Sequence, residues 1–369
     1  MKRRSKLSIA VAAGLAAIAL CGCAVTRASA DMPPTSALAA ESLYQDNPAM
    51  STMVSASTGK LAFKSDGGYY KHSGSDLWAT LRSASTPNTV TAIKTIPNQN
   101  IATLRVNADL CGVAVEPSES GSFEFSYIGV KEAGDIAVET AIKDGVLTVT
   151  CTGAMPTEGY VNTDPDFRVN TVLVGVPTGV LQEIRLDCGV GSLLVNGVDV
   201  PVRGIGNSGL IRVTGNTISA SVELQCDRGV LAVQGTTVSA PVILNARNGS
   251  VALTAATVTG KADLSTKNGS MDIKVDQLDN ARLESRNGSI TAEIDAVGEN
   301  VFAGVENGML KFHLTKEPQN LVFHLSGGWD GRWGAELLKG WHDGYTVGTG
   351  KPVLELSASP NGILSFTVN

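Results

Sequence analysis

Aromatic residues are scarce in this chain: Phe, Tyr and Trp together make up 5% of its 369 residues. Glycine is abundant instead, with 40 residues, so the chain has many small side chains and many places to bend. The formal net charge of -6 is modest and argues against general binding of nucleic acids. The hydrophobic fraction of 43% is enough to bury a core and excludes a disordered tail.

Sequence signatures of catalysis and metal binding are also missing. There is no Gly-x-Ser-x-Gly nucleophile elbow, and the four histidines, at positions 72, 313, 324 and 342, form no metal-ligand pattern. The mature chain has no Cys-x-x-Cys spacing, and the Gly-Gly-x-Gly-x-Asp repeat of calcium-binding coils is absent. We therefore expect a protein that is not an enzyme and that uses no cofactor and no metal.

The longest N-terminal hydrophobic run, from Leu7 to Leu20, is shorter than the about 20 residues that a spanning helix needs. It follows four basic residues, which is the order of a secretory signal. The sequence Leu-Cys-Gly-Cys that ends at Cys23 resembles a bacterial lipobox, which predicts a signal over residues 1–22 and diacylation of Cys23. The alternative is cleavage after Ala30, which leaves a soluble secreted protein. Residues 23–87, rich in Ala, Ser, Thr and Pro near their start, are expected to form a tether.

A short phrase built on Asn-Gly returns at a nearly fixed interval in the rest of the chain. Taking one glycine per unit as an anchor gives a spacing of 20 residues, with a single spacing of 19. The anchors are Gly189, Gly209, Gly229, Gly249, Gly269, Gly288, Gly308 and Gly328. A period of this length is typical of a solenoid.

Apolar residues recur at the same places in each unit, seven and five residues before the anchor and two, four and nine residues after it. They alternate with polar residues, which is the pattern of half-buried strands. Twenty residues hold about two strands but not a strand and a helix. The predicted fold class is therefore all-β: a single-stranded parallel β-helix (β-solenoid) with coils of about 20 residues, over residues 88–369, preceded by the export signal and the tether.

Four asparagines directly precede anchors, and we expect them at sharp corners of the coils, where Asn and Gly tolerate a left-handed backbone. Stacked side chains of this kind can hydrogen-bond along the rod as a ladder. The predicted ladder consists of Asn248, Asn268, Asn287 and Asn307.

The segments around the first coils carry a resemblance to a known family. They include "CGVAV", a strand that ends in Val-Pro ("NTVLVGVP"), then "LQEI" and the glycine-centred coils. This order resembles the DUF4097 "putative adhesin" family, a β-strand-repeat domain of bacterial envelope proteins, over about residues 88–369. The resemblance implies the same solenoid fold, with "LELSASPNGILSFTV" as the last coil, and brings no catalytic residues. The chain departs from the family in an insertion over residues 327–350.

Four cysteines remain after the signal: Cys111, Cys151, Cys188 and Cys226. Cys226 lies three before its anchor, in an inward column, whereas Cys188 lies one before Gly189, at a corner, so these two are not expected to meet. Cys111 and Cys188 occupy similar corners and pair if their coils are neighbours. Buried free thiols are the other interpretation.

Outward positions next to the corner hold cations in three adjacent coils, Arg247, Lys267 and Arg286, flanked by Asp227 and Glu306. They form either a basic stripe that attracts anionic polymer or a solvated ladder of mixed charge. A polysaccharide-active β-helix enzyme is the catalytic rival, and it would need an acid and a base that converge on one face. The acidic, basic and His residues available for it at outward positions are Asp272, Lys274, Glu293, Lys311 and His313.

The insertion carries most of the chain's tryptophan, in Trp329, Trp333 and Trp341, together with Tyr345. These rings either cap the open end of the solenoid or contact a partner. Taken together, the sequence predicts an extracytoplasmic protein, held at the membrane by an N-terminal lipid, that serves adhesion or envelope interaction. Its expected partner is a cell-surface glycan, a wall polymer or an envelope protein. An envelope-stress accessory module is an alternative role.

Overall fold

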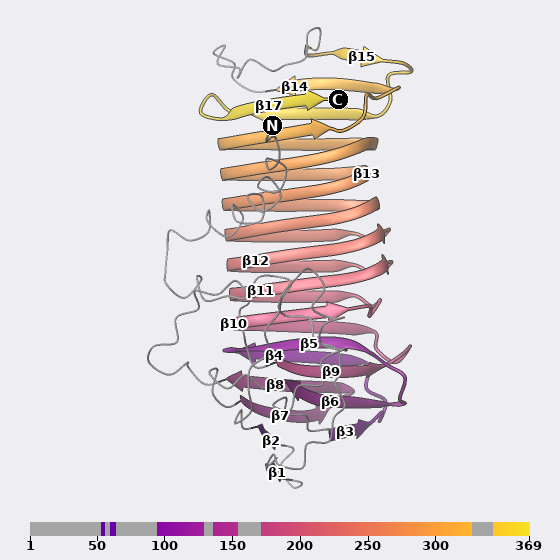
Figure 1. Cartoon of the computed structure of the whole chain (residues 1–369), viewed down its shortest axis with the longest axis vertical. Helices are drawn as coiled ribbons and strands as arrows, with labels where there is room; N and C mark the ends of the chain where they lie inside the picture. Colours follow the sequence, from indigo (N-terminus) through magenta and orange to yellow (C-terminus); the bar gives the residue numbers. More distant parts are fainter. Residues whose placement is uncertain (1–52, 56–59, 64–93, 129–135, 154–170, 327–341) are drawn as a thin grey trace, which may run out of the picture.

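The computed structural model describes residues 53–55, 60–63, 94–128, 136–153, 171–326 and 342–369. Every regular element in these ranges is a β-strand. The strands stack along one axis into an elongated rod (Figure 1). The prediction of an all-β solenoid is confirmed.

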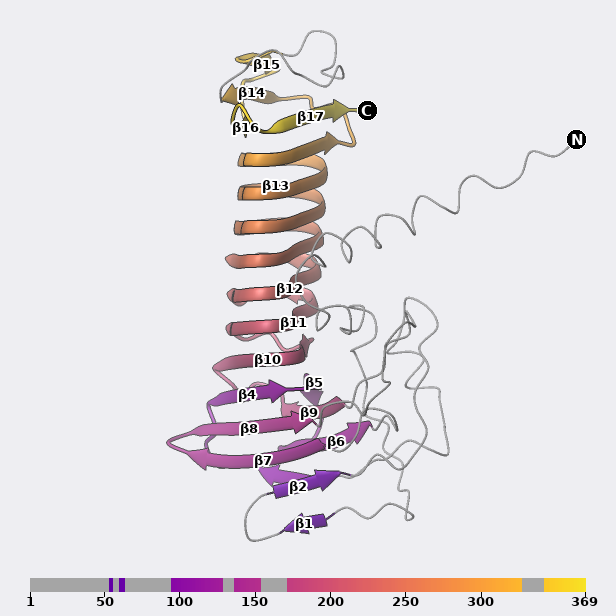
Figure 2. The same cartoon turned by 90° about the vertical axis from the view of Figure 1, so that its left-hand side faces the viewer.

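The middle of the rod is a parallel solenoid. Its strands are β10 (Glu183–Asn196), β11 (Val202–Ile218), β12 (Val222–Val238) and β13 (Val242–Leu314). Equivalent residues one coil apart pair in register, as Val202 does with Val222 and Val222 with Val242. β13 alone is 73 residues long and winds through successive coils, each of which Figure 2 shows as a flattened loop. Each coil thus supplies one stretch before its anchor glycine and one after it, and the two sets of stretches form facing layers.

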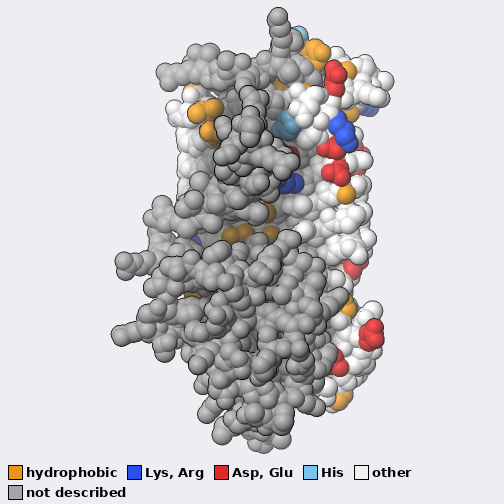
Figure 3. Space-filling model, viewed as in Figure 1, with side chains coloured by type: hydrophobic (Ala, Val, Ile, Leu, Met, Phe, Trp, Pro, Cys, Tyr) orange, Lys and Arg blue, Asp and Glu red, His pale blue; other side chains and the backbone are white. Residues whose placement is uncertain are grey.

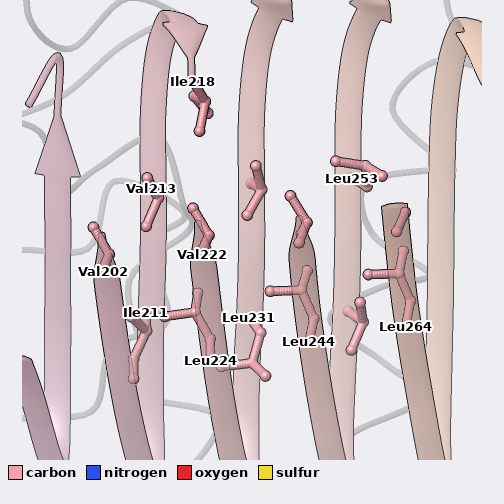
Figure 4. Packing of buried hydrophobic residues seen from close by; sticks show 14 of the residues in the cluster. Val202, Ile211, Val213, Ile218, Val222, Leu224, Leu231, Leu244, Leu253 and Leu264 are labelled. Carbon is pink, nitrogen blue, oxygen red and sulfur yellow. The ribbon is translucent and has the colours of Figure 1, made fainter. Parts of the chain in front are cut away.

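The core lies between these layers, where the sequence pattern predicted it. In β12 and β13, the residues seven and five before the anchor and two and four after it are at most 8% exposed. Side chains from both layers, among them Leu224, Leu231, Leu244 and Leu253, point into the space between them (Figure 4). Each coil thus removes a set of aliphatic side chains from water, and this burial is the main stabilising contribution.

The N-terminal end of the rod is closed by strands of mixed direction. β4 (Thr103–Asp109) and β5 (Cys111–Ser118) pair in parallel with the two halves of β10, and β8 (Val146–Gly153) and β9 (Thr171–Pro177) pair in parallel with β4 and β5. Antiparallel strands follow on the outside: β7 (Ile136–Lys143), β2 (Lys60–Phe63) and β1 (Met53–Ser55) beyond β8, and β6 (Ser122–Ile128) and β3 (Lys94–Pro97) beyond β9. These hairpins cover the edge that a bare coil would leave open.

At the C-terminal end the chain does not stack its coils in sequence order. β16 (Val353–Ala358) and β17 (Ile363–Val368) form the coil that lies directly on the last turn of β13. β14 (Leu321–Ser326) pairs with the far side of β16 and, antiparallel, with β15 (Tyr345–Val347). With Gly328 as an anchor, the sequence places Leu321 and Phe323 directly on Val301 and Ala303. This expectation is wrong, because β16 lies between them and Leu354 pairs with both Val301 and Phe323.

Phenylalanines fill the core at this end. The ring of Phe366 in β17 stacks on Phe323 with 4.8 Å between centroids and lies 6.3 Å from the ring of Phe312. All three are at most 1% exposed. This cluster joins β13, β17 and β14 into one core and replaces the aliphatic filling of the middle coils.

One anchor glycine was misassigned. Gly191, not Gly189, pairs with Gly209, so the first spacing is 18 residues (209 − 191), against 20 or 19 in the coils that follow. Cys188 consequently pairs with Gly206 and lies in the same column as Cys226. The expectation that Cys188 sits at a corner, outside that column, is wrong. The apolar residues Leu193 and Val195 decide the register, because they align with Ile211 and Val213 in the core.

Candidate functional site

A ladder of asparagine side chains runs along one corner of the rod. The Nδ2 group of Asn268 donates to Oδ1 of Asn248 at 2.7 Å, Asn287 donates to Asn268 at 2.8 Å, and Asn307 donates to Asn287 at 2.9 Å. Three of the four side chains, those of Asn268, Asn287 and Asn307, are exposed. Each amide therefore satisfies its neighbour and still offers further hydrogen-bonding capacity to solvent or to a partner.

The left-handed backbone expected at this corner is found at two anchor glycines, Gly229 (φ 129°) and Gly308 (φ 155°), but at none of the four asparagines, for which the expectation is wrong. In the described part of the chain the non-glycine residues with positive φ are Asn100, Leu110 and Asp144. The anchor glycines are needed mainly because successive coils approach closely. A Cβ on Gly269 or Gly288 would lie closer than 3.0 Å to the carbonyl oxygen of the preceding anchor. Only glycine fits a position with so little room.

Hydroxyl groups continue the polar ladder on both sides of the corner. The side chains of Ser250 and Ser270, one residue after their anchors, are hydrogen-bonded at 2.9 Å. Thr266 donates to Ser285 at 2.9 Å, three residues before the anchors, where both are buried. The corner is thus a polar seam that satisfies its own groups from coil to coil.

Two of the three cations in the candidate basic stripe are in ion pairs. Arg247 lies 3.4 Å from Asp227, and Arg286 lies 3.0 Å from Glu306. Within the described ranges no ion pair involves Lys267, which is exposed. Figure 3 shows acidic and basic side chains next to each other on the upper part of the visible edge of the rod, and acidic side chains below them. The column therefore matches a solvated ladder of mixed charge, with Lys267 as its available cation.

The opposite layer holds the groups that an acid and base mechanism would use. Lys274 forms an ion pair with Glu293 at 3.4 Å, and Nδ1 of His313 lies 2.7 Å from the hydroxyl of Thr367. Burial is the main cause that raises the pKa of the half-buried Asp272; nearby Lys274 opposes the rise and Glu293 adds to it. Asp272 is thus the side chain to test for catalysis, although its neighbours are already engaged with each other.

Cys111, Cys151, Cys188 and Cys226 are all buried, and the structure joins no two of them by a disulfide. Burial is the first cause that raises the pKa of Cys188 and that of Cys226, the latter to about 12. Among the residues that the structure describes, no three His, Cys, Asp or Glu side chains are grouped so that they could hold a metal ion.

Part of the sequence-predicted site lies outside the described residues, namely Cys23, Trp329, Trp333 and Trp341. Tyr345 is described: it lies in β15, packs partly buried against the core, and meets the ring of His342 edge-on at 5.7 Å. This placement favours the capping interpretation for Tyr345. The described ranges contain no helix that is both long and apolar enough to cross a membrane.

Aligning the coils by their anchor glycines also predicts a cation–π contact that the sequence analysis did not name. The guanidinium of Arg282 lies 5.5 Å from the ring centroid of Phe302. Both residues stand six before their anchors in adjacent coils, so aligning the outward columns places them side by side. This cation–π contact adds to the coil-to-coil bonding on the outer surface.

No family model matches the chain, and no curated protein matches it. Solved structures that are similar include a "putative cell adhesion protein" from Clostridium sporogenes (10% identity, 76% of this chain and 100% of the other, TM-score 0.24). Two others are a "putative adhesin" from Bacteroides fragilis (15%, 76% and 97%, TM-score 0.33) and a "putative lipid binding protein" from Parabacteroides distasonis (14%, 76% and 96%, TM-score 0.34). All three TM-scores lie below 0.5, so nothing about their binding is transferred to this chain.

Proposed function

We propose that the chain is an exported, lipid-anchored envelope protein whose solenoid presents a rigid, non-catalytic surface for adhesion or another envelope interaction. The observation that carries this proposal is the repetition of outward polar groups. Exposed amides bond to their equivalents in the next coil, as Asn287 does to Asn268, and so do exposed charges, as Arg286 does to Glu306. Such a surface is straight and periodic, with a repeat near the strand spacing of about 4.8 Å, and it suits an extended partner such as a wall polymer or glycan.

Anchoring can be tested at the signal. Replacing Cys23 with Ala removes the thiol that would carry the lipid, so the protein should leave the membrane fraction and lose labelling by a radioactive lipid precursor. Cys21→Ala is the matched control, because it leaves Leu20, Gly22 and Cys23 in place. A Cys23→Ala protein that still fractionates and labels like wild type would show that the lipobox interpretation is wrong.

Binding can be tested at the cation column. Replacing Arg247, Lys267 and Arg286 together with Ser should weaken binding to an anionic wall polymer at low salt. All three are replaced at once because each exposed contact contributes only about 0–1 kcal/mol to binding. The control variant removes the same charge elsewhere, by replacing Lys261, Lys274 and Lys311 with Ser. Equal binding by the two triple variants would remove the column from the proposal.

The same polymer distinguishes a binding protein from an enzyme. We expect the polymer to be recovered intact after long incubation with the full-length protein. Chromatography of the polymer should then show no fragments. Fragments that appear with wild type and disappear with Asp272→Asn would instead establish a polysaccharide-active enzyme, and would contradict the proposed function.

A further inference from the structure

Three of the four thiols occupy one inward column of the rod. Ala108 pairs with both Cys151 and Cys188, and Gly206 pairs with both Cys188 and Cys226. Successive cysteines in this column are therefore two strand spacings apart, or roughly 9.6 Å between Cα atoms. A disulfide needs Cα atoms within about 7 Å. The repeat thus keeps these three thiols from joining one another.

Cys111 stands outside this column and next to Cys151. It follows the corner at Leu110, whose φ is 57°, and opens β5, where its backbone pairs with Gly191. Its Sγ atom donates a hydrogen bond to the carbonyl oxygen of Cys151 at 3.5 Å, and both residues are buried. Cys151 is therefore the member of the column that Cys111 contacts through a hydrogen bond.

The Cys188 side chain extends toward β11, the next coil and the one farther from Cys111. A Cβ on Gly209 would lie 2.6 Å from the Cys188 sulfur, so that thiol fills the space which the glycine leaves. The hydrogen bond of the Cys111 thiol goes to Cys151 and not to Cys188. The pairing of Cys111 with Cys188, which the sequence left open, is thus less favoured than that of Cys111 with Cys151.

We propose that Cys111 and Cys151 form a disulfide that fastens the N-terminal strands to the first coil. The reaction is exchange with the disulfide of a thiol oxidoreductase or of oxidised glutathione. One cysteine thiolate attacks that disulfide and releases one thiol, and the second cysteine then displaces the other thiol from the mixed disulfide. The protein loses two protons and two electrons as the sulfur–sulfur bond forms, and the incoming disulfide is reduced to two thiols.

The bond would form while the chain folds. Cys111 is 0% exposed and Cys151 is 1% exposed in the folded protein, so an oxidant reaches them only before β8 pairs with β4. Hydrogen bonding to Cys111, followed by burial, raises the pKa of the Cys151 thiol well above its ordinary value. The folded, reduced protein therefore holds little of the thiolate that exchange requires.

Trypsin separates the four cysteines, which makes the pairing directly measurable. They fall on the peptides 106–131, 144–168, 186–203 and 213–228. The full-length chain is refolded in oxidised and reduced glutathione, unfolded in an alkylating reagent, digested without reductant and analysed by mass spectrometry. We expect peptides 106–131 and 144–168 to be linked, and the other two to carry the alkyl label. No linked pair, or a link between 106–131 and 186–203, would overturn the proposal.

Stability gives a second measurement. The oxidised protein should melt about 5–10 °C above the reduced protein, because the bond constrains a loop of about 40 residues in the unfolded chain. Cys111→Ala and Cys151→Ala should each abolish this dependence on reductant, while Cys188→Ala and Cys226→Ala should keep it. A dependence that survives in Cys151→Ala would contradict the assignment. The assay needs no cell compartment, so its failure would leave the proposed function untouched.

Discussion

Replacing Leu264 with Asp is expected to abolish cooperative folding of the solenoid. Leu264 is 0% exposed and lies between Leu244 and Leu283 in the column five residues before the anchors. An isolated carboxylate at this place loses its hydration and finds no partner, which costs several kcal/mol. That cost is a large part of the about 5–15 kcal/mol that stabilises an ordinary protein. Circular dichroism during heating should show the β signal lost at a much lower temperature, or absent from the start.

The neighbouring residue provides the control for this prediction. Ser265 points outward, so Ser265→Asp adds the same charge one residue along the chain and should change the free energy of unfolding by less than about 0.5 kcal/mol. Similar melting of wild type and Leu264→Asp would show that the column does not face the core.

The sequence was sufficient to predict the middle of the rod because every coil repeats the same physical problem. Each must bury one face of each stretch, so apolar residues return at fixed distances from the anchor, as Val222, Val242 and Ala262 do. Each coil also stacks on an equivalent coil, so the same preference for an apolar or a polar residue appears at the same position in several coils. The alternation that predicts a strand in one coil is thereby confirmed by its neighbours.

The two ends could not be predicted in the same way, because nothing there repeats. An end must cover strand edges, and many different chain paths do this equally well. The placement of β16 between β13 and β14 is an example: Leu321 and Phe323 have the spacing of another coil, yet Leu354 and Leu356 occupy the positions above Val301 and Ala303. The repeat period alone does not show which of the two matching segments, β14 or β16, stacks directly on β13.

The first anchor was misassigned for a related reason. The sequence "CGVGS" offers glycines at 189 and 191, and a constant spacing of 20 selects the wrong one. The structure selects Gly191 because Leu193 and Val195 then reach the core. Burial of apolar side chains outweighs the regularity of the loop, since a corner can lose two residues at little cost. Comparing all apolar columns, rather than the glycine alone, would have given this register.

Replacing Gly269 with Ala is expected to destabilise the rod, although the same change elsewhere in a protein is often neutral or favourable. The new Cβ would lie closer than 3.0 Å to the carbonyl oxygen of Gly249, which is backbone and has no alternative rotamer. The coils would have to separate at the corner where Asn268 bonds to Asn248 and Asn287. Overpacking of this kind costs about 1–3 kcal/mol, and loss of the adjoining ladder bonds adds about 0.5–1.5 kcal/mol for each.

Gly215→Ala is the matched control, and it separates the clash from any general effect of removing a glycine. A Cβ at Gly215 would meet its nearest neighbour, the carbonyl oxygen of Thr217, at 3.4 Å. The equivalent position two coils later is already Ala255, which is 6% exposed. Guanidinium unfolding should therefore show Gly215→Ala with an unchanged or slightly higher midpoint and Gly269→Ala with a clearly lower one. Equal midpoints would mean that the close approach of successive anchors does not decide which residue can stand at the corner.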